Sequence, residues 1–198
     1  MTNTKRTSKQ TQLLRAAREL ISRYGFRRVT VEEICRKAAV SKMTFYKHYA
    51  NKTAIAQAVI RDIFDAMRHE RDEALRQDAS LAWKVERIIE MEMDLSTQIG
   101  EEFVQDFFQS PELQPLMTEI MEEGYAALEG LYRQGQASGE VRQDVDIRLM
   151  MYMTRQLYLV MQDSTIVSNY ATLRDFSREL ICLYFYGVLS RGDEGEGV

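Results

Sequence analysis

Apolar residues recur at helical spacing along almost the whole chain, and few residues interrupt that pattern. The 198 residues include only two prolines and ten glycines, so long elements have few places where they must stop. β-branched runs with the period-two alternation of half-buried strands are absent. The sequence therefore predicts an all-α fold.

Capping residues and glycines divide this pattern into about nine helices. Thr30 and Glu33 predict a capping box, and Ser41 and Asn51 predict the next two helix starts. Ser110 followed by a proline predicts another capped start, with a kink at Pro115. The helices are expected over residues 9–24, 30–38, 41–49, 51–77, 80–99, 103–108, 110–134, 144–163 and 170–190.

The charges are distributed unevenly between the two ends of the chain. Residues 1–52 contain 13 Lys and Arg against 3 Asp and Glu, whereas residues 53–198 contain 13 against 27. The net charge of −4 conceals this division. A basic segment joined to an acidic remainder indicates a nucleic-acid-binding domain followed by a domain with another role.

The cysteines and the hydropathy predict a cytoplasmic protein without metal or cofactor. Cys35 and Cys182 lie in different predicted helices, without the spacing of a metal site or a redox pair. The polar, basic first ten residues lead into no apolar core of a signal peptide. No stretch approaches the roughly 18 apolar residues of a membrane span.

Two short helices separated by a tight turn at residues 39–40 form a helix-turn-helix pattern over about residues 30–49. Their apolar positions are expected to pack on the first helix. The helix starts at Thr30, Ser41 and Asn51 offer backbone donors for phosphates, and Lys52 lies in a first turn. The polar side chains of the second short helix are then free to enter a major groove: Lys42, Thr44, Tyr46, Lys47 and His48.

The segment LLRAARELISRYGFRRVTVEEICRKAAVSKMTFYKHYANKTAIAQAV, residues 13–59, resembles the DNA-binding domain of the TetR family of bacterial transcriptional regulators. The resemblance implies a dimeric regulator, most often a repressor, that binds a palindromic operator in double-stranded DNA. It implies a DNA-binding domain over residues 1–52 and a helical effector-binding and dimerisation domain over residues 53–198. The positions that match phosphate contacts are Thr30, Ser41, Tyr46, His48 and Lys52, and those that match base contacts are Lys42, Met43, Thr44 and Lys47.

Two residues depart from the family pattern. Ala39 occupies a turn position where the family commonly has glycine, and alanine in a left-handed conformation costs on the order of 1 kcal/mol. Met43 replaces a residue that is frequently small, which predicts an apolar contact such as one to a thymine methyl group.

The acidic remainder is rich in methionine and aromatic residues, which adapt to irregular apolar surfaces. This inventory predicts a pocket for a small hydrophobic or aromatic effector of unidentified structure, although packing of a core explains most of these residues equally well. The expected pocket residues are Trp83, Met91, Phe103, Phe107, Met117, Met121, Tyr125, Met150 and Tyr158.

The last two predicted helices carry apolar residues on two faces. One face closes the core of the subunit and the other meets a second copy, giving a homodimer interface of two helices per subunit. The residues expected there are Met153, Leu159, Phe176, Leu180, Leu183 and Tyr184.

The sequence is also compatible with two other interpretations. The first is a regulator without a small-molecule effector, acting through a protein partner. The second is a metal-binding protein or enzyme, for which Asp65, His69 and Glu73 form the one ligand-like stripe. Interleaved arginines favour surface ion pairs there, and no nucleophile is placed beside a base, so the chain is not expected to be an enzyme.

Overall fold

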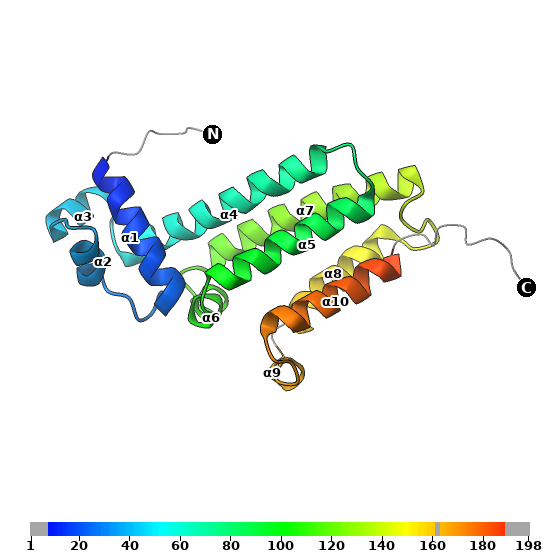
Figure 1. Cartoon of the computed structure of the whole chain (residues 1–198). Helices are drawn as coiled ribbons and strands as arrows, with labels where there is room; N and C mark the ends of the chain where they lie inside the picture. The colour runs from blue at the N-terminus through cyan, green and yellow to red at the C-terminus, as the bar shows by residue number, and fades with distance from the viewer. Residues whose placement is uncertain (1–7, 161–162, 189–198) are drawn as a thin grey trace, which may run out of the picture. The chain divides into compact units, whose positions relative to one another are not determined.

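The computed structural model describes the backbone of residues 8–160 and 163–188, and helices form the framework of these ranges (Figure 1). They are α1 (Ser8–Tyr24), α2 (Val31–Lys37), α3 (Lys42–His48), α4 (Lys52–Arg76), α5 (Leu81–Gln98), α6 (Glu101–Gln109), α7 (Gln114–Ser138), α8 (Ile147–Val160), α9 (Ser164–Val167) and α10 (Leu173–Val188). Nine of them correspond to predicted helices, and α9 is an additional turn of four residues. The predicted all-α fold class is confirmed.

The described helices fall into two compact units. Unit 1 comprises residues 1–70 and 95–121, and unit 2 comprises residues 71–94 and 122–198. The boundary crosses α4, α5 and α7, so each of these helices contributes residues to both units. Unit 1 extends well beyond the 1–52 segment, because α6 and the start of α7 pack on the same core as the amino-terminal helices.

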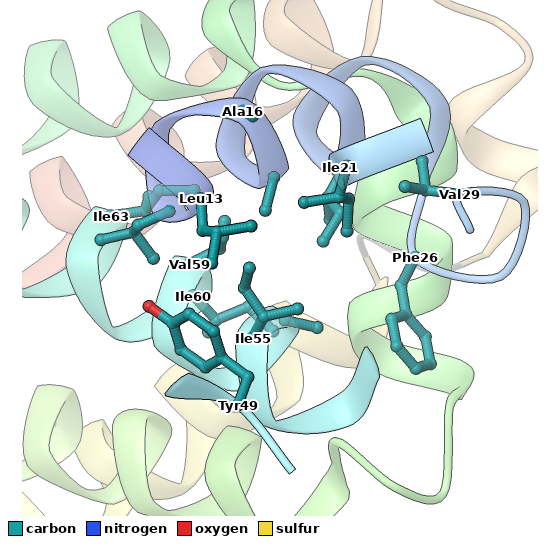
Figure 2. Close-up of a cluster of buried hydrophobic side chains, with 14 of the residues drawn as sticks. Leu13, Ala16, Ile21, Phe26, Val29, Tyr49, Ile55, Val59, Ile60 and Ile63 are labelled. Carbon is teal, nitrogen blue, oxygen red and sulfur yellow. The ribbon is translucent and has the colours of Figure 1, made fainter. Parts of the chain in front are cut away.

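The core of unit 1 joins the helix-turn-helix to α4. Figure 2 shows Leu13 and Ile21 of α1 together with Ile55, Val59 and Ile60 of α4, all of them at most 1% exposed. The apolar side chains of α2 and α3 that face this core are buried as well, namely Ile34, Cys35 and Phe45, together with Tyr49 directly after α3. This shared core fixes α2 and α3 on α1, so that their outward faces have a defined orientation.

Unit 2 has its own core, made by α5, α7, α8 and α10. Tyr132, Val141 and Met150 are at most 1% exposed at its centre. The hydroxyl of Tyr184 on α10 donates to the carbonyl of Met150 on α8 at 2.5 Å, and Thr154 donates to the same carbonyl at 2.9 Å. Burial raises the pKa of the Tyr132 hydroxyl far above its usual range, so this group stays protonated.

The connection between α6 and α7 differs from the prediction. Ser110 does not start a helix: it follows the last residue of α6, and its buried hydroxyl has no hydrogen-bond partner among the described residues. Helix α7 begins at Gln114, which puts Pro115 in the first turn, where a proline removes no helical hydrogen bond. The kink expected at Pro115 is therefore wrong.

The carboxyl-terminal end of α7 lies further along the chain than the sequence indicated. Gly135 stays inside α7, and Gly139 ends it with a φ of 81°. Of the described helices, none combines the length and the hydropathy that crossing a bilayer would need. The basic residues Lys5 and Arg6 and the residues from Gly192 onward lie outside the described part of the chain.

Candidate nucleic-acid interface

The starts of α2, α3 and α4 are capped as the sequence predicts. Thr30 Oγ1 accepts from the Glu33 N–H at 3.2 Å while Glu33 accepts from the Thr30 N–H at 2.8 Å, which completes the capping box. Ser41 Oγ accepts from the Thr44 N–H at 3.1 Å, and Asn51 Oδ1 accepts from the Ala54 N–H at 2.8 Å. Each cap satisfies one amide of the first turn and leaves others free for a phosphate.

The turn between α2 and α3 contains a strained residue. Ala39 has a φ of 53°, in the left-handed region that favours glycine, as expected from its place in the turn. The next residue, Val40, donates its N–H to the Cys35 carbonyl at 3.0 Å and so closes the turn. The turn that sets the angle between α2 and α3 therefore includes a residue whose backbone conformation is unfavourable in free energy.

Ala39→Gly is expected to stabilise the protein by about 1 kcal/mol, because glycine adopts the left-handed conformation without a Cβ clash. For a chain of this size, that gain raises the melting temperature by about 2–4 °C. Thermal unfolding followed by circular dichroism measures it. The matched control is Ala38→Gly, at a right-handed position with a φ of −78°, where glycine should lower stability. An unchanged or lower melting temperature for Ala39→Gly would contradict the strain.

Helix α3 presents a continuous polar face with one large apolar side chain. Met43 is 82% exposed and Tyr46 is 56% exposed, whereas Phe45 between them is fully buried. The predicted contact residues on and before this face are Ser41, Lys42 and Lys47, which are exposed, and Thr44 and His48, which are half-buried. Exposed cations, hydroxyls and a methionine on one seven-residue helix are suited to contact phosphates and base edges in a major groove.

Lys42 is paired with a residue of the preceding helix. Its ammonium group forms an ion pair with the carboxylate of Glu32, and both side chains are 58% exposed. The hydrogen bond between them lowers the pKa of the Glu32 carboxyl and raises that of the Lys42 ammonium. The sequence analysis missed this pair because the two residues lie in different helices, where helical spacing rules do not apply.

Lys52 makes contacts that the sequence analysis did not predict. Its ammonium group donates to the carbonyls of Phe26 and Arg27 at 3.0 and 3.2 Å and lies 4.5 Å from the centre of the Phe26 ring. The half-buried side chain therefore ties the start of α4 to the loop between α1 and α2. The remaining phosphate candidate, Thr30, is exposed at the end of that loop.

A second tie to this loop comes from α6. The buried carboxylate of Asp106 accepts from the Arg27 N–H at 2.8 Å and lies 3.3 Å from the Arg27 Nε. The Gly100 N–H donates to the Ser22 carbonyl at 2.7 Å. The loop that leads into the helix-turn-helix is thus held by residues about 80 positions away, and no short-range sequence signal reveals them.

The residues expected to line an effector pocket are distributed over two cores. Phe103 and Phe107 are buried in the core of unit 1, with Met117 half-buried beside them, whereas Met150 and Tyr125 belong to the core of unit 2. Met91 is buried and Met121 is half-buried, and the side chain of Tyr158 lies outside the described residues.

Trp83 differs most from its expected place in a pocket wall, because 43% of it is exposed. Its neighbours Leu81, Lys84 and Val85 occupy the inward positions of α5.

The residues expected at a dimer interface also divide into two groups. Met153, Leu159 and Leu183 are 42%, 56% and 74% exposed. Leu180 is half-buried, Phe176 is 3% exposed, and the half-buried Tyr184 bonds to Met150. The assignment of Phe176 and Tyr184 to a dimer interface stays a prediction, although Phe176 is already buried within the single chain and Tyr184 packs against the core of unit 2.

Further apolar side chains extend the exposed group on α8 and α10, which lie side by side in unit 2 (Figure 1). We call this group the α8–α10 stripe. It comprises Leu149, Tyr152, Met153, Leu159, Leu183 and Tyr186, each more than 40% exposed. The four residues on α8 are separated by three, one and six positions, which at about 100° per residue keeps them within roughly 120° of one another on one side of the helix.

Asp65, His69 and Glu73 lie on α4. The Asp65 carboxylate accepts from Arg68 at 2.6 Å, as expected if these residues form surface ion pairs. Within the residues that the structure describes, no group of three or more His, Cys, Asp and Glu side chains is arranged to hold a metal ion.

Comparison with known proteins concentrates on the amino-terminal part of the chain. Residues 13–59 match the family model described as bacterial regulatory proteins, tetR family. The HTH-type transcriptional regulator UidR of Escherichia coli K12 is 41% identical over 51 residues. That match covers 26% of this chain and about a quarter, 26%, of the relative.

Two further comparisons extend into the remainder of the chain. The fatty acid metabolism regulator protein of Bacillus subtilis is 24% identical over 151 residues, covering 73% of this chain and 77% of that one. The crystal structure of the transcriptional regulator FadR from Bacillus subtilis in complex with stearoyl-CoA is similar in fold, with a TM-score of 0.70. It is 21% identical, and the match covers 90% of this chain and 98% of that one.

Proposed function

Since this chain belongs to the tetR family of bacterial regulatory proteins, whose amino-terminal domain its residues 13–59 match, we propose that it is a DNA-binding transcriptional regulator. The observation that carries the proposal is the outward face of α3, held by a capped helix-turn-helix on a closed core. A DNA-binding regulator acts by binding and not by catalysis, so we propose no enzymatic activity for this chain. The regulator would act in the cytoplasm, where its DNA lies.

The proposed contacts to DNA divide into two kinds. Lys42, Met43, Thr44 and Lys47 would meet base edges in the major groove, where exposed Met43 suits a thymine methyl group. The phosphates would be contacted by Thr30, Ser41, Tyr46, His48 and Lys52. Because Lys52 already binds two carbonyls, we assign it a double role, in which it holds the loop and adds its charge to the phosphate surface.

We further propose that the regulator acts as a homodimer through the α8–α10 stripe. Exposed apolar side chains in this number on two adjacent helices favour burial against a copy of the same surface. Two recognition helices on one dimer reach half-sites about 34–36 Å apart, which predicts a palindromic operator.

The effector is proposed to be a small hydrophobic or aromatic molecule that shifts the dimer away from its DNA-binding geometry and so relieves repression. The methionine and aromatic residues of segment 53–198 support a hydrophobic effector, as does the stearoyl-CoA in the similar Bacillus subtilis structure. Release requires that the effector bind the non-binding geometry more tightly than the binding one. A regulator that responds to a protein partner instead would show no release by any such molecule.

The experiment that tests the proposal is selection of DNA from a random pool by the full-length protein. We expect a palindromic or near-palindromic consensus, with affinity that falls steeply as salt rises because several phosphates are neutralised. Tyr46→Ala should weaken binding to all DNA sequences alike, whereas Thr44→Ala should also change the preferred bases. If the selected DNA molecules shared no sequence, the proposed function as a sequence-specific regulator would be wrong.

Glu32→Gln is expected to strengthen binding to the selected operator about two- to fivefold, because it frees the Lys42 ammonium for the base edges and removes a carboxylate beside the phosphates. The slope of log affinity against log salt should become steeper by about one. Fluorescence anisotropy at several salt concentrations measures both. The matched control is Glu19→Gln, which removes the same charge from the pair with Lys37. Equal gains in both variants would show that net charge, and not the Lys42 pair, sets the effect.

A further inference from the structure

Unit 1 contains a cavity that none of the predicted contact or pocket residues lines. Its volume is about 430 Å³, within the range of small-molecule sites, and it opens between α1, the end of α2, α4 and the end of α5. The lining residues are Arg15, Arg18, Glu19, Leu20, Ser22, Arg23, Tyr24, Lys37, Ile63, Leu95 and Ile99.

The rim of the cavity is strongly basic, with four cationic side chains and one carboxylate. Two of the cations are engaged, since Arg18 lies 3.1 Å from Asp62 and Lys37 lies 2.6 Å from Glu19. Arg23 makes no ion pair with any described residue, and its guanidinium lies 5.3 Å from the centre of the Tyr24 ring. The fourth cation, Arg15, acts electrostatically on Glu19, so Arg23 is the guanidinium at the rim without a carboxylate neighbour among the described residues.

The floor of the cavity is apolar. Ile63 is 2% exposed and belongs to the core of unit 1. Leu20, Tyr24, Leu95 and Ile99 are half-buried and pack against that core. A ligand that entered past the rim would therefore exchange water for hydrocarbon contacts on three helices.

We propose that this cavity binds a small amphipathic anion, a carboxylate on a short apolar chain. The carboxylate would bind the Arg23 guanidinium, which presents paired donors to such a group. The chain would lie over Leu20, Leu95 and Ile99. This site shares no residue with those expected to line the effector pocket, and it does not rest on the proposed regulatory function.

Occupation of the cavity has a direct consequence for α1. Helix α1 supports α2 and α3 through the shared core, and its Ser22 carbonyl bonds to Gly100 before α6. A ligand held between α1, α4 and α5 stabilises the arrangement of these helices that it fits, and so shifts the population of unit 1 toward that arrangement.

Calorimetric titration of the intact protein with octanoate tests the site directly, without DNA. We expect saturable binding that is at least about tenfold tighter than that of octan-1-ol or octyltrimethylammonium, which carry the same chain without the anion. Arg23→Gln should lower the affinity for octanoate about tenfold. The matched control is Arg28→Gln, since Arg28 lies 4.9 Å from the same Tyr24 ring but does not line the cavity.

A second variant tests the cavity independently of charge. Ser22→Phe fills the space with the arginines retained and leaves the backbone bond from Gly100 to residue 22 in place, so octanoate binding should be lost while folding, followed by circular dichroism, is kept. Octanoate that binds Arg23→Gln or Ser22→Phe as tightly as the natural protein would overturn the site, as would equal binding of octan-1-ol. Either result leaves operator selection unaffected.

Discussion

Leu183→Glu is expected to convert the proposed homodimer to a monomer and to weaken operator binding by at least about a hundredfold, because one recognition helix then binds without its partner. Leu183 is the most exposed large apolar residue of α8 and α10, at 74%. In the proposed interface, a carboxylate there would be buried against the second subunit, and a buried charge is costly without a partner. Analytical ultracentrifugation measures the oligomeric state, and a band-shift titration measures the operator affinity.

The matched control for this variant is Ile166→Glu. Ile166 is also exposed, at 40%, but it lies on α9 outside the α8–α10 stripe. The control should remain dimeric with unchanged affinity. A dimeric Leu183→Glu, or a monomer with full affinity for the palindrome, would refute the proposed interface.

Gly25→Ala is expected to lower the free energy of unfolding by about 3 kcal/mol or more, since it combines backbone strain with overpacking. Gly25 has a φ of 78°, and a Cβ at this position would lie 2.5 Å from Asp106 Oδ2 and 3.1 Å from the Glu102 backbone. The loop must then move away from α6 and lose the bond between Arg27 and Asp106. Urea denaturation followed by circular dichroism measures the loss.

Gly139→Ala separates the two contributions. Gly139 has almost the same φ, 81°, but no atom lies within 4 Å of the added Cβ. This variant should lose about 1–2 kcal/mol, the cost of the left-handed conformation alone. Equal losses at both positions would show that the contact with α6 does not constrain the loop.

The sequence predicts the helix-turn-helix well because its determinants are local. Thr30, Ser41 and Asn51 each cap a helix that begins at the next residue, and their partners are three residues away. Burial of Phe45 between exposed neighbours follows from the same helical period. The fold class and the exposed face of α3 could therefore be read without a structure.

The long-range hydrogen bonds that hold the helix-turn-helix could not be predicted in the same way. Lys52 binds carbonyls about 25 residues earlier, and Asp106 binds a backbone amide 79 residues earlier. Such contacts depend on how separate helices pack, which no periodic pattern records. The solvent-facing side of α10 was uncertain for a related reason, because both of its faces are apolar and periodicity alone does not decide which one turns inward.

The discontinuous make-up of unit 1 has a consequence for how the protein is synthesised. Its core takes residues from α1 to α4 and then, after residues assigned to unit 2, from α6 and the start of α7. The ribosome must therefore complete about the first 120 residues before the DNA-binding unit can close its core. Until α6 has been made, the Arg27 amide in the loop after α1 lacks the Asp106 carboxylate that accepts from it. Premature termination before α6 leaves a fragment with exposed core residues for proteolysis to remove.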